Sequence, residues 1–378
     1  GVEMLLEHFG GPTATFDEFC KAAAGGAFDA AIVVGGYRKE WAGVVARDAV
    51  EDGWFPDPDD APGRPVTAVA EERARSIVSR NHSPDIPFDA SINPYRGCEH
   101  GCIYCYARPS HAWLGLSPGL DFESKLFYKP DAAKILKQEL AKKNYQCAPI
   151  ALGPNTDSYQ PVERRLEITR SIVKVLLETK HPLGLVTKSA LVERDIDLYR
   201  EMAQENLANI MITISTLDPL LSRKLEPRAA VPKRRLQIIE RLAANGIPVG
   251  VLVAPVIPVL TDPALEQIMQ AVRNAGALTA GYILLRLPHE VSPLFREWLE
   301  IHWPGKASHV MSQIRQARGG RDNVARFGER MRGTGQYAGM INQRFRLMHR
   351  KLDFPGLPDL RTDLFAKPKL RGDQMDLF

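Results

Sequence analysis

Short apolar runs alternate with longer amphipathic stretches between about residues 88 and 286 of this 378-residue chain. Turn residues bound the apolar runs, which cover 150–153, 183–187, 210–215, 249–255 and 281–286. Short continuous runs of this kind are typical of parallel strands that are buried on both faces. The stretches between them have apolar residues three and four positions apart, which predicts helices at 132–142, 163–180, 192–205, 233–245 and 264–275.

Regular alternation of strand and helix predicts βαβ crossovers and a parallel sheet. If residues 91–96 supply the first strand, the chain has six βα units. The predicted fold class is therefore α/β, with a sheet that has both faces covered or curls toward a barrel. With 378 residues that are 44% hydrophobic, the chain can bury one large core.

Polar residues follow the predicted strands. In a (β/α) barrel ligands bind at the C-terminal strand ends, so these residues are candidates for cofactor binding. Asn155, Thr156 and Asp157 follow the second strand, Lys188 follows the third, and Ser215 follows the fourth. Each has a structural alternative: the first three favour an Asx-type turn, Lys188 could be a solvated surface lysine, and Ser215 could simply end a strand.

Three of the five cysteines lie within eight residues, as a CX3CX2C motif formed by Cys98, Cys102 and Cys105. Three converging thiolates suit an iron–sulfur cluster, and since such clusters usually take four Cys ligands, one iron would have no protein ligand. The alternative is a structural zinc site completed by His100 or a distant residue. Cys20 and Cys147 are most simply small buried hydrophobic residues.

The CX3CX2C motif followed by Tyr106 resembles the signature of radical S-adenosylmethionine (SAM) enzymes. The resemblance implies a partial (β/α)6 TIM-type barrel and a [4Fe–4S] cluster whose fourth iron is chelated by SAM. It also implies reductive cleavage of SAM to a 5′-deoxyadenosyl radical, which abstracts hydrogen from substrate, and a one-electron reductant of the flavodoxin or ferredoxin type.

From residue 49 to the C-terminus the chain resembles the spore photoproduct lyase-like branch, in particular an uncharacterised bacterial subgroup, most distinctively at 91–98 and 285–288. This resemblance implies that Tyr104 and Tyr106 lie in the active site and that Lys188 and Ser215 contact SAM. Tyr104 could instead be a core aromatic residue.

One position departs from the lyase pattern. The lyase has a hydrogen-donating cysteine in the turn after its second strand, ahead of an acidic residue, whereas this chain has Pro154, Asn155 and Thr156 ahead of Asp157. The radical-generating chemistry is therefore expected, but repair of thymine photodimers does not follow. Tyr106 is an alternative hydrogen donor.

The sequence predicts that the chain is divided into four segments. Residues 1–44 contain a Rossmann-like fragment that resembles part of a molybdopterin oxidoreductase or NADH dehydrogenase large subunit; it is foreign to the barrel, and we assign it no activity. Residues 45–87 are rich in Pro and Asp and then in Arg, which predicts a linking arm. Residues 88–300 form the core barrel, and 301–378 form a basic helical extension and tail.

The net charge of +4 identifies no partner, but residues 306–351 carry eleven Lys or Arg against two acidic residues. This segment could neutralise nucleic-acid phosphates, with Phe327, Tyr337 and Phe345 stacking on bases. The alternative is an amphipathic helical cap with a solvated basic side. No long apolar run or secretory signal is present, so we expect no membrane span, and clustered reduced thiols suit the cytoplasm.

Three classes of function remain open from the sequence. The first is a lyase-like radical SAM enzyme that acts on nucleic acid or a nucleotide-like substrate. The second is the same chemistry on a peptide or small molecule. The third is a non-catalytic nucleic-acid-binding protein with a structural metal site. The sequence does not identify the substrate or the oligomeric state.

Overall fold

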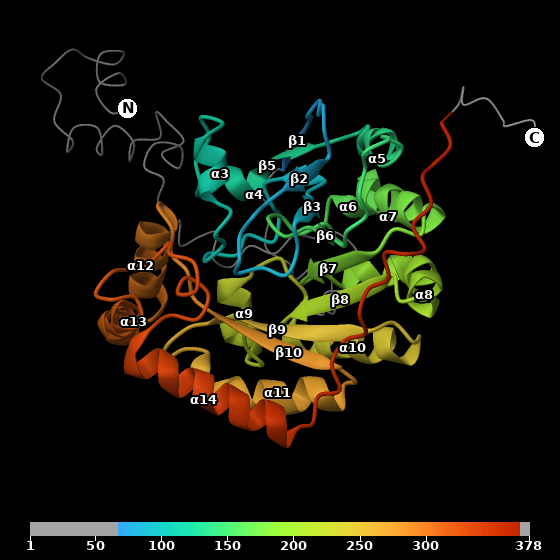
Figure 1. Ribbon diagram of the computed structural model, residues 1–378. Coiled ribbons are helices and arrows are strands. Elements are labelled where there is room, and N and C mark those ends of the chain that lie inside the picture. The colour runs from blue at the N-terminus through green and yellow to red at the C-terminus, as the bar shows by residue number, and fades with distance from the viewer. Residues whose placement is uncertain (1–66, 371–378) are drawn as a thin grey trace, which may run out of the picture.

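The fold is described by a computed structural model for residues 67–370 (Figure 1). The Rossmann-like fragment predicted within residues 1–44, Cys20 and the first part of the predicted arm lie outside the described residues. Within 67–370, a seven-stranded sheet has the order β10-β9-β8-β7-β6-β3-β2. Its strands are β2 (Val78–Arg80), β3 (Ala90–Ile92), β6 (Ile150–Leu152), β7 (Leu183–Thr187), β8 (Ala208–Thr213), β9 (Val249–Val256) and β10 (Thr279–Leu284).

Strands β3 and β6 to β10 run parallel to one another, and β2 alone is antiparallel, in its pairing with β3. The six parallel strands confirm the predicted α/β fold class with six βα units. The sheet curves without closing, because β10 and β2 stand at its two ends in the described part of the chain. The barrel is thus partial, as the resemblance implied.

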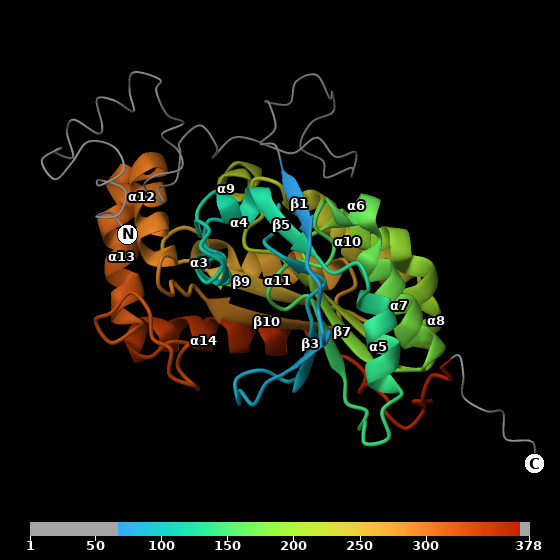
Figure 2. The same cartoon turned by 90° about the horizontal axis from the view of Figure 1, so that it is seen from above.

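Helices cover the outer face of the sheet (Figures 1 and 2). They join the strands in one core: Leu185 of β7, Ile212 of β8 and Val251 of β9 are all fully buried and belong to the same hydrophobic cluster as Leu176 and Ile239 from the helices. The covering elements are α5 (Ala132–Leu140), α6 (Glu163–Leu166), α7 (Ile168–Glu178), η4 (Ala190–Asp195), α8 (Ile196–Gln204), α10 (Pro232–Ala244), η5 (Asp262–Ala264) and α11 (Leu265–Asn274).

The first strand is shorter than predicted. Expected over 91–96, it ends at Ile92. Pro94 has no N–H to donate to the ladder, so the strand is interrupted there. The chain then enters β4 (Tyr95–Arg96), which belongs to a second sheet with β1 (Ala68–Glu71) and β5 (Lys125–Tyr128) in the order β1-β5-β4.

The helix predicted at 163–180 is divided at Glu167, which has a left-handed backbone with φ of 51°. The division lets the Glu163 carboxylate accept hydrogen bonds from the backbone N–H groups of Thr169 (2.9 Å) and Arg170 (3.3 Å), at the start of α7. Glu163 thereby satisfies donors that the first turn of a helix leaves unpaired.

The C-terminal part of the chain completes the fold. After α12 (Val291–His302) and α13 (Pro304–Gln316), α14 (Gly335–Lys351) lies beside α11 (Figure 1). Its residues Ile341 and Phe345 are buried in the main core. Within residues 67–370 no helix combines the length and apolarity that crossing a membrane requires.

Three sequence-based expectations are wrong in detail. Phe345 is only 7% exposed and Tyr337 is half-buried, so of the three aromatics expected to stack on bases only Phe327 is exposed. The solvated basic side of an amphipathic cap is found on α14, where Arg346, Arg350 and Lys351 are exposed. It does not extend to Arg318, whose buried guanidinium donates to the carbonyl groups of Leu284, Leu285, Glu329 and Arg330. Cys147 is half-buried instead of buried.

Candidate active site

The three motif cysteines lie on one loop between β4 and α3 (Pro109–Ala112), at the C-terminal end of β3. Cys98 and Cys102 are each 7% exposed, and Cys105 is half-buried. Burial raises the pKa of the Cys98 thiol well above its usual value, and the nearby groups Asp157, Cys102 and Cys105 raise it further.

Two glycines allow the loop its shape. Gly97 and Gly101 have positive φ angles of 76° and 64°, which residues other than glycine rarely adopt. A Cβ at Gly97 would lie 2.7 Å from Leu126 Cδ2, and one at Gly101 would overlap the Glu123 carboxylate. The loop that carries the cysteines can therefore take this course only because glycine stands at both positions.

A buried cluster of charged residues holds the loop from the side. The Arg108 guanidinium is 1% exposed and donates to the carbonyl groups of Cys102 (3.0 Å) and Gly101 (3.1 Å). Arg228 donates to the carbonyl of Glu99. One oxygen of Glu123 accepts from Arg108 (2.9 Å), and its other oxygen accepts from Arg228. Two loop segments are therefore fixed by two arginines that share one carboxylate. The short helix α4 (Asp121–Ser124) carries that carboxylate.

The loop that follows β6 is fastened to the cysteine loop. The Gln160 side chain accepts from the Glu99 N–H (2.9 Å) and donates to the Gly97 carbonyl (3.1 Å). His100 Nδ1 lies 3.3 Å from Asp157 Oδ2. These contacts bring the first two strand ends of the barrel together, as the strand-end argument predicted.

Asp157 also fastens this loop to the end of β7. Its carboxylate accepts from the backbone of Tyr159 (2.9 Å), the hydroxyl of Thr187 (2.7 Å) and the backbone of Lys188 (2.8 Å). Burial alone would raise the pKa of Asp157, but His100 and the hydrogen bonds outweigh it and lower the pKa to about 2. The bond to Tyr159 is the Asx-type turn that was the structural alternative, so Asp157 has a structural role here.

Tyr104 belongs to a buried polar network below the cysteines. Its hydroxyl donates to Glu226 Oε1, which also accepts from Ser215 (3.1 Å), and Glu226 Oε2 accepts from Arg235. Glu226 is completely buried, and Arg235 is 1% exposed. Burial opposes the charge on Glu226, but Arg235 and Lys188 outweigh it and lower the pKa of this carboxyl. The network fixes Tyr104 and Ser215 at the end of β8.

Lys188 reaches the same region from the end of β7. Its ammonium group lies 6.0 Å from the centre of the Tyr104 ring, which is within cation–π range. Burial would lower the pKa of Lys188, but the nearby Cys102, Glu226 and Asp157 together raise it, so the side chain stays charged. No hydrogen bond of this ammonium group is found within residues 67–370. Lys188 therefore has donors available beside the cysteines.

Tyr106 lies nearer to solvent. Its side chain is 42% exposed, its hydroxyl donates to the Pro154 carbonyl, and the Arg286 guanidinium lies 5.3 Å from the ring centre. Asn155 is exposed, and the buried Thr156 hydroxyl donates to the Tyr95 carbonyl (2.8 Å). Asn155 and Thr156 thus have no contact with the cysteines or Lys188 among the described residues, and Ser215 is linked to Tyr104 only through Glu226.

Sequence reasoning missed the buried charged residues. The helix and strand patterns of the sequence gave no reason to expect charges in the core. Most of the residues that pair with one another are also far apart along the chain. The one signal in the sequence was the position after β8, since the segment from Glu226 to Arg235 follows the same strand end as Ser215. The missed residues are Arg108, Glu123, Arg228, Glu226 and Arg235.

The donor set fits an iron–sulfur cluster. Three thiols lie on one loop, two of them buried and the third half-buried. The positive charges of Lys188 and Arg235 offset part of the effect of burial, which raises the pKa of Cys102 to about 12. Within residues 67–370, no group of three or more His, Cys, Asp or Glu side chains could hold a single metal ion. A cubane has a different requirement, because each thiolate binds a separate iron.

The family model of the radical SAM superfamily matches residues 92–272. Uncharacterised proteins of Mycobacterium bovis and Mycobacterium tuberculosis are 36% identical over 233 residues, which is 61% of this chain and 68% of theirs. An uncharacterised protein of Methanocaldococcus jannaschii is 28% identical over 213 residues, 56% of this chain and 76% of its own.

Solved structures of spore photoproduct lyase share the fold. One, complexed with dinucleoside spore photoproduct, has a TM-score of 0.56 and 14% identity over 76% of this chain and 80% of the lyase. Another, with AdoMet and dinucleoside spore photoproduct bound, has a TM-score of 0.56 and 13% identity. The motif cysteines, the partial barrel and the matched family model agree, and the chain belongs to the radical SAM superfamily.

Proposed function

We propose that this protein is a radical SAM enzyme in which Cys98, Cys102 and Cys105 hold a [4Fe–4S] cluster. The observation that carries the proposal is that three thiols lie on one largely buried loop, with the Lys188 ammonium group near Cys102. In this superfamily the cluster supplies one electron to SAM bound at its open iron, and a 5′-deoxyadenosyl radical results. A flavodoxin- or ferredoxin-type protein would be the reductant, and the reduced thiols suit a cytoplasmic location.

The residues around the cysteines would bind and orient SAM. Lys188 has free N–H donors for an anionic group, and Ser215 has an acceptor oxygen held in place by Glu226. Tyr104 is held in place through its bond to the same carboxylate. Tyr106, at the exposed edge, would face the substrate and is our candidate for the hydrogen donor. Asn155, Thr156 and Asp157 would shape the neighbouring wall.

For the substrate class we propose nucleic acid or a nucleotide-like molecule. The excess of basic residues in 306–351 and the structural similarity to a lyase that binds a dinucleoside support this. The reaction would be lyase-like but not photoproduct repair, because Pro154 and Asn155 stand where the lyase pattern has its cysteine. The core barrel would comprise residues 88–300, with 301–378 as its basic extension.

SAM binding at the cluster can be tested by electron paramagnetic resonance. We expect the spectrum of the reconstituted, dithionite-reduced protein to change when SAM is added, because the SAM amine and carboxylate would take the position open on the fourth iron. S-Adenosylhomocysteine, which lacks the sulfonium charge, serves as a comparison ligand. An unchanged spectrum at saturating SAM, with the iron content confirmed, would contradict the proposal.

A further inference from the structure

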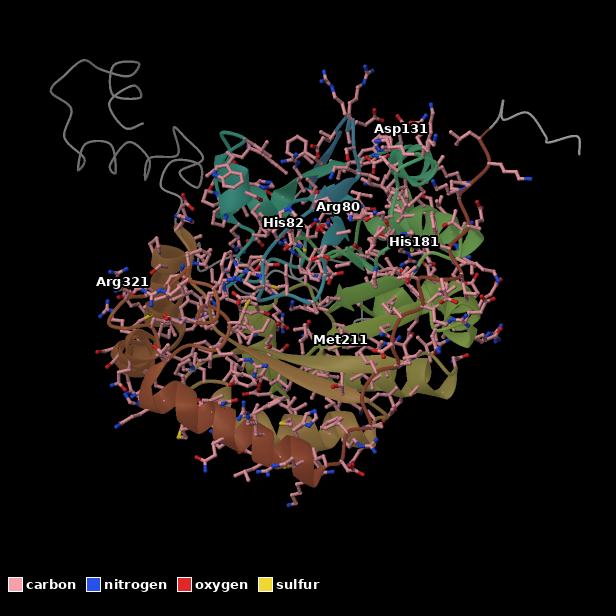
Figure 3. The ribbon with its side chains drawn as sticks, viewed as in Figure 1. Arg80, His82, Asp131, His181, Met211 and Arg321 are labelled. Atoms are coloured by element: carbon pink, nitrogen blue, oxygen red, sulfur yellow. The ribbon has the colours of Figure 1, made fainter. Side chains whose placement is uncertain are left out.

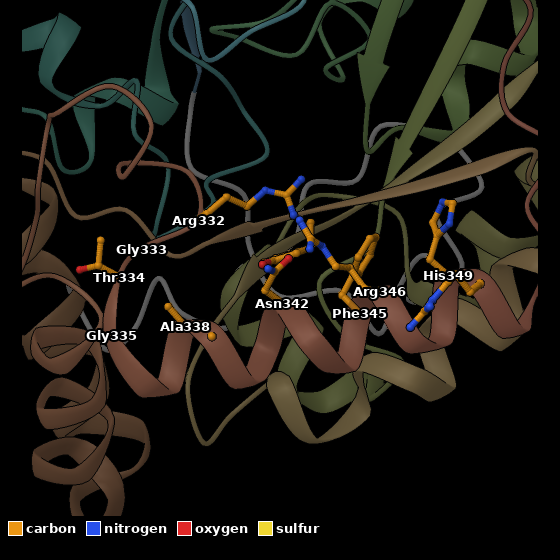
Figure 4. Close-up of a pocket in the computed structure, with 12 residues that line it drawn as sticks. Arg332, Gly333, Thr334, Gly335, Ala338, Asn342, Phe345, Arg346 and His349 are labelled. Carbon is orange, nitrogen blue, oxygen red and sulfur yellow. The ribbon is translucent and has the colours of Figure 1, made fainter.

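A large basic cavity lies between α14 and β10, the last strand of the seven-stranded sheet (Figure 4). Its volume is about 1060 Å³. Three arginines line it, Arg332 from the loop before α14 and Arg346 and Arg350 from α14, together with Asn342 and His349. We call it the arginine cavity. Among the described residues that line it there is no aspartate or glutamate.

The arginines have no carboxylate partners. Within residues 67–370, the Arg346 and Arg350 guanidinium groups make no hydrogen bond or ion pair, and Arg332 only stacks on the Tyr282 ring at 4.2 Å. Neighbouring arginines differ, since Arg344 pairs with Glu266 at 2.7 Å and Arg330 pairs with Asp85 at 2.6 Å. In Figure 4, Arg332 and Arg346 point into the space between them. Like charges repel, so this arrangement favours an anion between them.

A second observation also indicates a ligand. The Tyr282 side chain is 2% exposed and lines the cavity, yet its buried hydroxyl has no hydrogen-bond partner within the described residues. A buried hydroxyl without a partner is unfavourable unless a ligand or water satisfies it. Because the hydroxyl itself has almost no accessible surface, an oxygen of a bound anion would accept from it only after the Arg332 side chain that covers the ring moves aside.

The aromatic rings in the cavity are already covered, so they cannot stack on a base. Arg332 covers the Tyr282 ring, and Phe345 packs against it with ring centres 4.8 Å apart. Phe345 itself is buried. Recognition must therefore come from charge and hydrogen bonds, which suits phosphate oxygens better than bases.

The spacing of the basic residues suits more than one phosphate group. Asn342, Arg346 and Arg350 are four residues apart, so they share one face of α14 and succeed one another by about 6 Å along its axis. Arg332 faces them from the preceding loop. We propose that the arginine cavity binds a ligand with two or more phosphate groups, either a polyphosphate or the backbone of a single-stranded nucleic acid.

Gly339 offers a sharp test, because it lines the cavity from α14 and a Cβ there would meet nothing within 4 Å. Gly339→Glu places a negative charge in the cavity, and Gly339→Gln is the neutral control of the same size. Both replace a helical glycine, so they should raise helix stability equally. Equal thermal unfolding midpoints would show that both variants fold.

Binding of a labelled single-stranded oligothymidylate to the full chain, measured by anisotropy, should weaken by more than about tenfold in Gly339→Glu relative to Gly339→Gln. The new carboxylate would compete with phosphate for the charged hydrogen bonds of the arginines. The double variant Arg346→Ala, Arg350→Ala should weaken binding likewise and reduce the salt slope by about 0.7 for each phosphate that is no longer neutralised. Arg80→Ala, which removes an exposed arginine outside both the cavity and the 306–351 segment (Figure 3), should leave the dissociation constant unchanged.

Competition with inorganic tripolyphosphate distinguishes the two possible ligands, a free polyphosphate and the backbone of a single-stranded nucleic acid. Displacement of the oligonucleotide at similar phosphate concentration indicates a free polyphosphate ligand, and failure to displace it indicates a nucleic-acid backbone. Equal affinities of Gly339→Glu and Gly339→Gln, or no binding of either probe, would overturn the proposal. Binding does not require the cluster, so a Cys102→Ala chain should bind as tightly; this separates failure of this site from failure of the radical chemistry.

Discussion

Replacing Cys102 by alanine should reduce the iron bound after anaerobic reconstitution to background. Three thiolates are the minimum protein ligand set for a cluster with one open iron, and no fourth Cys is nearby among the described residues. The same loss is expected for Cys98→Ala and Cys105→Ala. The iron and sulfide content per chain is the measurement.

Cys147→Ala is the matched control for this experiment. Cys147 is a half-buried free cysteine that lies just before β6, at the opposite end of the strand from the site. The Cys147→Ala chain should retain the full iron content. Full iron in the Cys102→Ala chain, or a comparable loss in Cys147→Ala, would show that the ligands have been assigned wrongly.

The second large effect is expected for Glu123→Ala. This carboxylate is the shared partner of Arg108 and Arg228, so its removal leaves two buried guanidinium groups without a counter-charge. Breaking a buried ion pair in this way typically costs about 3–5 kcal/mol of unfolding free energy. Urea denaturation measures the loss, and weaker cluster retention should accompany it because both arginines hold the cysteine loop.

Glu72→Ala provides the comparison. Glu72 also pairs with an arginine, Arg96, at 2.7 Å, but the side chains are 23% and 45% exposed. An exposed pair of this kind contributes about 0–1 kcal/mol. Equal losses of stability in the two variants would mean that Glu123 does not organise the loop as described.

The apolar periodicity of the sequence was sufficient to predict the strand–helix succession and hence the sheet. It worked because buried parallel strands and amphipathic helices have different repeats. The ends of the elements were less predictable. The first strand ends at Ile92, two residues before Pro94, and the helix break at Glu167 depends on what Glu163 contacts in the folded chain. Such breaks follow from tertiary contacts, which a local pattern does not contain.

The candidate site was also predictable only in part from the sequence. The cysteine spacing and the polar strand ends predicted the loop, Lys188 and Ser215 together, because parallel strands bring their C-terminal ends to one edge. The buried Glu226–Arg235 and Glu123–Arg228 pairs could not be predicted, since charge at a position does not say whether a side chain faces solvent. Arg318 shows the difficulty: it lies in a basic segment, yet it binds four backbone carbonyl groups in the interior.

The most direct test of radical SAM chemistry is the fate of SAM itself. The reconstituted protein is reduced with dithionite under anaerobic conditions, incubated with SAM without added substrate, and analysed by chromatography beside a Cys105→Ala control. We predict slow formation of 5′-deoxyadenosine and methionine in equal amounts by the unaltered chain and none by the control. No cleavage above the control, in protein whose cluster content has been confirmed, would contradict the account.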